Sequence, residues 1–245
     1  MDAIIVQSPS KRFSETLAVD EISFAMPAGA TFGLLGGNGA GKTTTIAMLL
    51  GLLIPTAGSI RVLGHDMARD RFAALARMNF SSPYVALPHR LTVAENLRVY
   101  GHLYNVRHTE RRILELAGQL DLHALLDRPA GQLSSGQKTR VALAKSLINR
   151  PEVLLLDEPT ASLDPDTADQ VRTWLQSYQA ESGCTILLAS HNMAEVERLC
   201  GVVLMMKRGR IVDRGSPVEL LDRYGRDDLE AVFLDIARDR AREAV

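Results

Sequence analysis

The chain has 245 residues, 46% hydrophobic and 23% charged, a composition ordinary for a globular protein with a large core. Its 28 basic and 29 acidic residues give a formal net charge of −1, without the electrostatic footprint of a nucleic-acid surface. No apolar run approaches the ~18–20 residues that cross a bilayer, and residues 1–13 do not resemble a signal peptide. We therefore expect one cytoplasmic domain with an inserted subdomain, and Cys184 and Cys200 as reduced core residues.

The amino-terminal segment predicts a β-rich start that leads into a phosphate-binding arrangement. Residues 1–30 alternate polar and apolar around turns, which is typical of short antiparallel strands. A short apolar strand at 31–35 then enters a glycine-rich loop, and a helix is expected over 42–53. Strand, glycine loop and helix in this order form the arrangement that a phosphate loop requires.

Residues 36–43 match the pattern G-x-x-x-x-G-K-[ST] in full. Glycines let successive backbone amides point at a phosphate without side-chain clash, and the helix start adds partial positive charge. Lys42 supplies a positive charge toward the β- and γ-phosphates, and the Thr43 hydroxyl can ligate Mg²⁺. The alternative is a chance glycine turn, against which the flanking strand and helix argue. The residues predicted to bind nucleotide here are Gly36, Gly37, Asn38, Gly39, Ala40, Gly41, Lys42, Thr43 and Thr44.

The middle of the chain, residues 78–150, is predicted to be mostly helical. Thr92 and Glu95 fit a capping box, and apolar residues recur at helical spacing after it and over 110–126. Residues 133–137 open another helix with the run Leu-Ser-Ser-Gly-Gln. Its free amides and hydroxyls predict a second anion site, with a plain helix cap as the alternative. Two such helix ends with one nucleotide site suit a head-to-tail dimer.

Three apolar runs in the second half, at 153–156, 185–189 and 202–206, predict buried parallel strands. Ligands of open parallel sheets bind beyond the carboxyl ends of the strands, where Asp157, Glu158 and His191 follow. After a phosphate loop, Asp157 is predicted to hold the Mg²⁺ shell and Glu158 to polarise the attacking water; alone, the pair would indicate a solvated turn. Helical spacing of Leu229, Val232, Phe233 and Ile236 predicts a small carboxyl-terminal helix.

The order of residues 36–43, 133–137, 153–158, 162–164 and His191 resembles the ABC transporter ATPase family, whose hallmark is the Leu-Ser-x-Gly-Gln segment. The resemblance extends from about residue 4 to 206. It implies an α/β fold: a RecA-like phosphate-loop core with a parallel sheet, an N-terminal antiparallel β-subdomain and an inserted helical subdomain. We expect one ATPase domain over 1–220, its helical subdomain at about 84–150, and a helical tail over 221–245.

The resemblance also implies roles for individual residues. Phe13 would stack on adenine, with a core phenylalanine as the alternative. Ser135 and Gly136 would touch the γ-phosphate of an ATP held by a partner cassette, and Asp164 would couple the two sites. His191 would contact the γ-phosphate or hold the attacking water. The predicted catalytic residues are Glu158, His191 and Lys42, and the predicted Mg²⁺ ligands are Thr43 and Asp157.

The family usually carries a glutamine between the phosphate loop and the helical subdomain, and this chain has none between residues 42 and 110. Counting back from residues 91–93 places Pro83 at that position, beside Ser82. Because Mg²⁺ prefers hard oxygen ligands and keeps several waters, we predict that Ser81 or Ser82 compensates, directly or through water. A second departure is Gly37, where the family often has proline.

We expect an ATPase subunit, using ATP and Mg²⁺, that powers export through a separate transmembrane permease. It would work as a homodimer or paired cassette at the cytoplasmic face of the membrane, with no nucleic-acid partner. Residues 224–236 resemble the tails of drug and polysaccharide exporter ATPases. Apolar residues of the 80–90 segment are predicted to contact the permease, unless this loop packs on its own domain: Tyr84, Val85, Leu87 and Pro88.

Two alternatives belong to other classes. A soluble ABC ATPase acting on nucleic acid or ribosomes usually has tandem cassettes or a long coiled coil, and this chain shows neither a second phosphate loop nor a heptad run. A GTPase or nucleoside kinase has no use for the segment 133–137, and no Asn-Lys-x-Asp motif occurs.

Overall fold

A computed structural model describes residues 1–82 and 87–238, and the chain divides into two compact units. Unit 1 comprises Met1–Leu75 and Thr185–Val245, and unit 2 comprises Ala76–Cys184. The helices of the middle of the chain therefore belong to one unit, and the amino-terminal and carboxyl-terminal segments share the other.

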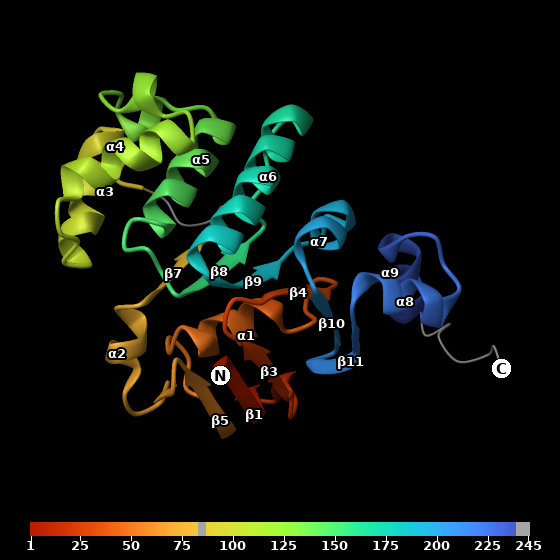
Figure 1. The fold of residues 1–245 in the computed structure, drawn as a ribbon. Helices are drawn as coiled ribbons and strands as arrows, with labels where there is room; N and C mark the ends of the chain where they lie inside the picture. The colour runs from red at the N-terminus through yellow and green to blue at the C-terminus, as the bar shows by residue number, and fades with distance from the viewer. Residues whose placement is uncertain (83–86, 239–245) are drawn as a thin grey trace. The chain divides into compact units, whose positions relative to one another are not determined.

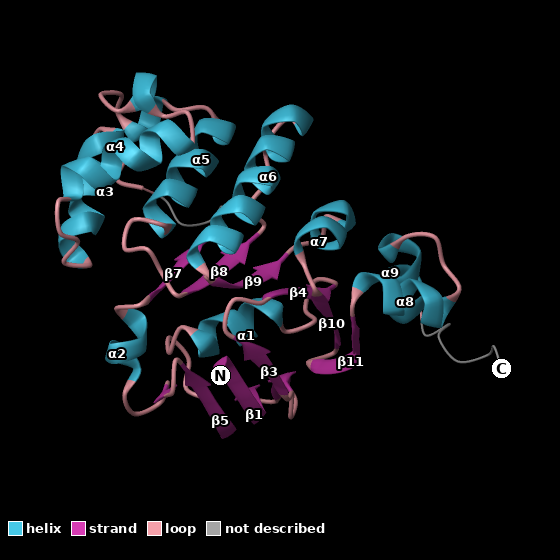
Figure 2. Ribbon diagram, viewed as in Figure 1, coloured by secondary structure: helices cyan, strands magenta, loops and turns pink. Residues whose placement is uncertain are grey.

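Unit 1 begins with an antiparallel sheet (Figure 2). Its long strand β1 pairs with β2, β3 and β5, and β5 pairs in turn with the short β6. Ile4 and Val6 on β1 face the core, as do Ile60 and Val62 on β5, so the alternation of the sequence becomes one buried face. The strands are β1 (Asp2–Phe13), β2 (Thr16–Val19), β3 (Phe24–Pro27), β5 (Ala57–Val62) and β6 (His65–Asp66).

The second sheet region of unit 1 follows the order β11-β10-β4-β9. Strands β9 and β10 run parallel to β4, whereas β11 returns antiparallel to β10. All five residues of β9 are buried, which explains why its sequence is apolar on both faces. The strands are β4 (Thr31–Gly36), β9 (Thr185–Ala189), β10 (Val202–Lys207) and β11 (Arg210–Gly215).

In its described residues, unit 1 also contains the helices α1 (Lys42–Leu49), α2 (Arg71–Leu75), α7 (Met193–Leu199), α8 (Pro217–Tyr224) and α9 (Leu229–Ala237). Helix α1 is shorter than the predicted 42–53, because the chain turns at Gly51, whose φ is +64°. Near the carboxyl end, α8 and α9 pack against each other (Figure 1). The ammonium of Lys207 ties α9 to β10 by donating to the carbonyl of Ile236 at 2.7 Å.

In unit 2, strands β7 and β8 run parallel, with a group of helices inserted between them in the sequence. Helix α3 packs on both α4 and α5. Gly101 permits the close approach of α3 and α4, because a Cβ there would lie 2.3 Å from Thr109 Cγ2. The elements are β7 (Met78–Ser81), α3 (Val93–Leu103), α4 (Thr109–Gln119), η1 (His123–Leu125), η2 (Ala130–Gln132), α5 (Ser135–Ser146), β8 (Val153–Asp157) and α6 (Pro165–Ser182).

Local sequence signals account for the ends of these helices. The capping box of Thr92 and Glu95 is present, with the amide of Glu95 donating to Thr92 Oγ1 at 3.1 Å. The 18-residue helix α6 was not predicted, although its signals were in the sequence. Asp164 caps its first turn, proline follows, and Gly183 ends it in the left-handed conformation.

The mixed α/β architecture, with an antiparallel amino-terminal sheet and an inserted group of helices, confirms the predicted fold class. Cys184 and Cys200 are both buried, as expected, and neither forms a disulfide within the described part of the chain. Over residues 1–82 and 87–238, no helix combines the length and apolar character that crossing a membrane would need.

Candidate functional site

The phosphate loop joins the carboxyl end of β4 to the first turn of α1, and two of its glycines lie where a side chain would clash. At Gly36, a Cβ would lie 2.7 Å from both Ala40 Cβ and the carbonyl oxygen of Met206. At Gly41, φ is +105° and a Cβ would meet the carbonyl oxygen of Ala18 at 2.6 Å. Glycine is thus required at both ends of the loop. Gly37 has open space around it, so a Cβ there would meet no neighbouring atom within 4 Å.

The loop is held from behind by the turn between β10 and β11. The amide of Gly209 donates to the carbonyl of Ala40 at 3.0 Å, and the amide of Asp20 donates to the carbonyl of Gly209 at 2.8 Å. Residues 37–39 at the tip are exposed. Lys42 donates from Nζ to the carbonyl of Gly36 at 2.5 Å and to that of Gly37 at 3.4 Å. Its ammonium therefore lies over the loop where phosphate oxygens would bind.

His191 lies at the same edge of the unit 1 sheet as the phosphate loop. The parallel register aligns Leu34 of β4 with Ala189 of β9, so Gly36 and His191 each lie two residues beyond the aligned pair. His191 is exposed at this edge. The structure thus brings together the loop and the histidine, which are more than 140 residues apart in the sequence.

The residues beside His191 are fixed by a network that the sequence analysis missed. Ser190 is fully buried, and its hydroxyl donates to the carboxylate of Glu195 at 2.6 Å. The Ser190 hydroxyl accepts from the amide of Asn192 at 3.1 Å, and Asn192 caps α7 by accepting from the amide of Glu195 at 3.2 Å. The signal was available, because asparagine followed three residues later by glutamate marks a helix start.

In unit 2, Asp157 ends strand β8 and contacts the serine that directly follows the neighbouring strand β7. Register pairs Ser81 with Leu156, which places Ser82 beside Asp157. The Ser82 hydroxyl donates to Asp157 Oδ2 at 3.4 Å, and Ser82 is buried. Hydroxyl and carboxylate oxygens are ligands that suit Mg²⁺. In the described part of the chain, no group of three or more histidine, cysteine or acidic side chains could hold a metal.

Glu158 follows Asp157 with φ at +52°, a left-handed conformation that turns the chain sharply at the strand end. Its carbonyl accepts from the amide of Ala161 at 3.1 Å, closing the turn. Such strain in a non-glycine residue concentrates at functional sites. The turn leads to Asp164, whose Oδ1 accepts from the amide of Thr167 at 3.0 Å. This hydrogen bond lowers the pKa of Asp164 below its ordinary value.

The segment 133–137 forms the amino end of α5, as its sequence predicted. Ser134 is the cap, accepting from the amide of Gln137 at 3.3 Å, while Gln137 accepts from the amide of Ser134 at 3.0 Å. Ser135 and Gly136 occupy the first turn, where a helix supplies no backbone acceptor for its amides. Ser135 is exposed, so this helix end can meet an anion or a partner.

Phe13 ends strand β1 with 45% of its surface exposed, which excludes the alternative of a core phenylalanine. The ammonium of Lys11 lies 5.3 Å from the centroid of its ring and donates to the carbonyl of Ile54 at 2.8 Å. The ring is thus presented to solvent on a restrained strand, which suits stacking on a flat base.

The expected permease contact of the 80–90 segment is corrected at one residue. Leu87 is only 8% exposed, so it packs on its own domain rather than forming part of a docking surface. Pro88 is exposed. Tyr84 and Val85 lie outside the described residues, as does Pro83, the position of the family's glutamine.

Comparison of this chain with known proteins points to one family. The family described as "ABC transporter" matches residues 19–161. The chain is 38% identical over 235 residues to the Nod factor export ATP-binding protein I of Ralstonia nicotianae (strain ATCC BAA-1114 / GMI1000), covering 94% of this chain and 72% of that protein.

Two solved structures share the fold. One is the ATP binding subunit of an ABC transporter, with a TM-score of 0.88 and 26% identity, covering 96% of this chain and 99% of that one. The other is a dimeric, post-hydrolysis state of an ATP-binding cassette bound to ADP and Pi, with a TM-score of 0.80 and 22% identity, covering 87% and 98%. With the phosphate loop, the carboxylates after β8 and the capped helix α5, these similarities show that the chain belongs to the ABC transporter family as an ATP-binding, ATP-hydrolysing cassette.

Proposed function

We propose that this cassette powers export through a separate membrane-spanning permease, at the cytoplasmic face of the membrane. The observation that carries the proposal is the 38% identity, across 94% of this chain, to a protein named as a Nod factor export ATP-binding protein. Because the permease recognises the cargo, this identity supports export as the shared function and assigns no cargo to this chain.

Within this function, ATP would bind at the phosphate loop, with Phe13 stacked on adenine and Lys42 facing the β- and γ-phosphates. Thr43 and Asp157 would supply protein ligands for Mg²⁺, which would neutralise developing charge on the phosphates. Ser82, hydrogen-bonded to Asp157, takes part in this shell through the aspartate or a water. Glu158 orients the attacking water, and the exposed His191 contacts the γ-phosphate or that water.

The second half of the site comes from another cassette in a head-to-tail dimer. Ser135 and Gly136 at the start of α5 would contact the γ-phosphate of the ATP bound to the partner, using first-turn amides that an anion satisfies well. Asp164, held by the amide of Thr167, would couple the two sites. A dimeric cassette structure with ADP and Pi shares the fold.

The decisive experiment is recovery of the partner from native membranes. The tagged chain, expressed in its own host, is captured after gentle detergent extraction, and co-purifying proteins are identified by mass spectrometry. We expect a polytopic membrane protein in stoichiometric amount. The Lys42→Ala variant should retain it, because that change removes catalytic charge and no docking surface. Recovery of ribosomes or nucleic acid without a membrane protein would contradict export and favour the soluble alternative.

A further inference from the structure

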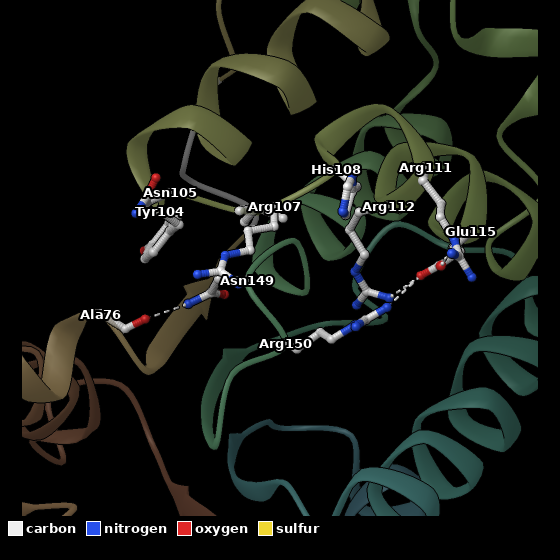
Figure 3. Close-up of a pocket in the computed structure, with 11 residues that line it drawn as sticks. Ala76, Tyr104, Asn105, Arg107, His108, Arg111, Arg112, Glu115, Asn149 and Arg150 are labelled. Atoms are coloured by element: carbon white, nitrogen blue, oxygen red, sulfur yellow. Dashed lines mark hydrogen bonds and ion pairs between the residues drawn. The ribbon is translucent and has the colours of Figure 1, made fainter.

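A pocket of about 400 Å³ opens in unit 2, and none of the site residues assigned above lines it. Its walls are the loop between α3 and α4, the first half of α4, and the segment that follows α5 (Figure 3). Pockets of this volume take small molecules. The helical part of the cassette therefore has a cavity that the ATPase chemistry does not use.

The pocket is strongly basic. Among the described residues, four arginines line it, Arg107, Arg111, Arg112 and Arg150, against one carboxylate, Glu115, which gives these side chains a net formal charge of +3 with histidine neutral. Three of the guanidinium groups converge on Glu115, as Figure 3 shows. Arg150 lies 2.8 Å from its carboxylate, and Arg111 and Arg112 each lie 3.3 Å from it. The single negative charge of Glu115 therefore neutralises only one of the three guanidinium charges around it.

Arg112 is the buried member of this cluster, with 7% of its side chain exposed. One amino group donates to the carbonyl of Leu147 at 2.7 Å and the other to Glu115 at 3.3 Å. Its buried Nε has no hydrogen-bond partner among the residues that the structure describes. Burial lowers the pKa of Arg112, and the nearby charge of Arg150 lowers it further. A bound anion would supply both the missing acceptor and the missing negative charge.

Backbone strain is concentrated in the same walls. Asn105, His108 and Arg150 adopt left-handed conformations, with φ of 51°, 55° and 49°. These conformations are uncommon outside glycine and asparagine and persist where the surrounding structure enforces them. His108 is also the cap of the 11-residue helix α4, and its side chain makes no capping hydrogen bond. The partial positive charge of that helix start adds to the guanidinium groups.

The geometry points to a binding site for a small molecule that carries two or more phosphate groups. The guanidinium fork matches phosphate oxygens in a bidentate manner, and several forks on one cavity select a multiply charged anion. Arg107 and Arg150 are exposed and make the outer contacts, while buried Arg112 is the anchor. Arg107 comes from the α3–α4 loop and Arg150 from the segment that follows α5, so the ligand would span two segments 43 positions apart.

Inorganic pyrophosphate is a direct probe of this site in the full-length protein. Isothermal titration is run after the phosphate loop has been saturated with ADP, so that further binding reports another site. We expect one saturable site per chain, weakened about tenfold or more by either Arg107→Gln or Arg150→Gln. The matched control, Arg128→Gln, removes one exposed positive charge from the same unit outside the pocket and should leave the affinity unchanged. Melting temperatures confirm that each variant is folded.

Three results would overturn the proposal. Pyrophosphate could fail to bind once ADP is present, which would mean that it uses only the phosphate loop. Arg128→Gln could weaken binding as much as the pocket variants, which would indicate general charge attraction. The chain could fail to bind pyrophosphate but sediment with phosphatidylglycerol vesicles and not with phosphatidylcholine vesicles. The arginines of the pocket would then recognise lipid headgroups and not a small phosphate compound. The export function stands in each case, because its test depends on the membrane partner.

Discussion

The ammonium group of Lys42 is held in place by the phosphate loop itself. Carbonyl oxygens of Gly36 and Gly37 hold the ammonium over the loop. Phosphate oxygens, which carry full charge, compete well with these neutral carbonyls for the same donor. The lysine is thus positioned before nucleotide arrives, and little reorganisation is needed at the moment of reaction.

We expect Lys42→Ala to lose most ATPase activity, about a hundredfold or more, because a charge facing the developing negative oxygens is removed. Phosphate release under saturating ATP and Mg²⁺ measures the effect. Arg61→Ala, which removes an exposed positive charge from β5 of the same unit, should keep near wild-type turnover. Turnover retained by Lys42→Ala would reject the assignment of the phosphate loop.

The Ser82 hydroxyl, 3.4 Å from Asp157 Oδ2, is the group that we predict to compensate for the missing glutamine. We expect Ser82→Ala to raise modestly the Mg²⁺ concentration that gives half-maximal ATPase activity, by about two- to fivefold, because a shared hydrogen bond is lost while the carboxylate remains. Thr43→Val should be severe, since it removes a direct ligand. Mg²⁺ titration of ATPase activity compares them.

The neighbouring Ser81→Ala provides the matched control, because Ser81 is buried one residue earlier on β7. It should leave the Mg²⁺ requirement unchanged. If Ser82→Ala also left the Mg²⁺ requirement unchanged, the aspartate would need no help from Ser82, and the proposed compensation by Ser82 would be wrong.

At the scale of elements, α5 carries an unusual buried amine. Lys145 is 7% exposed, donates from Nζ to the carbonyl of Phe80 at 2.9 Å, and lies 5.2 Å from the centroid of the Tyr100 ring. It therefore joins α5 to both β7 and α3. Burial lowers the pKa of Lys145 to about 8, because the charged form loses its hydration.

This lysine should make stability depend on pH. Between about pH 8 and pH 10.5 the folded protein has released the Lys145 proton while the unfolded chain still binds it, so the free energy of unfolding rises with pH. We expect wild type to gain about 2–3 kcal/mol relative to Lys145→Met across this window. Urea denaturation of both proteins at several pH values measures the difference, in which other titrating groups cancel. Parallel curves would show that the buried amine keeps its ordinary pKa.

At the scale of the whole molecule, the residues proposed for ATP are divided between two units. The phosphate loop and His191 belong to unit 1, whereas Asp157, Glu158 and the start of α5 belong to unit 2. The chain supplies one phosphate loop and one start of α5 that we propose to bind an anion. In a head-to-tail pair of chains, each phosphate loop would face the start of α5 from the other chain, which would give two sites.

We expect Glu158→Gln to bind ATP without hydrolysing it, because the amide cannot polarise the attacking water, and the dimer should therefore accumulate. Gel filtration with ATP and Mg²⁺ should show a shift toward twice the mass. ADP should give no shift, and neither should Glu181→Gln, a matched change at an exposed residue of α6. A monomer at saturating ATP would argue against the sandwich in the isolated subunit or against the role of Glu158.

Local sequence determined much of this protein. The phosphate loop could be predicted because glycine spacing, lysine and the following helix act over a few residues. The starts of α3 and α5 could also be predicted from the sequence, because a capping box involves residues only three positions apart. Buried parallel strands showed in apolar runs, and Asp157 and His191 were found because they follow those runs directly. The roles given to these residues at ATP are still predictions.

Only the tertiary structure decided how distant residues meet. The contact of Ser82 with Asp157 depends on the register of β7 and β8 across 75 positions, and hydrophobic pattern alone does not specify register between separated strands. Leu87 appeared to be an exposed loop residue until the structure showed it buried. The arginines of the unit 2 pocket look like ordinary surface charges in the sequence, and their convergence on Glu115 required the packing of the helices. Short-range geometry follows from neighbouring residues, whereas burial and charge clusters depend on which faces the folded chain brings together.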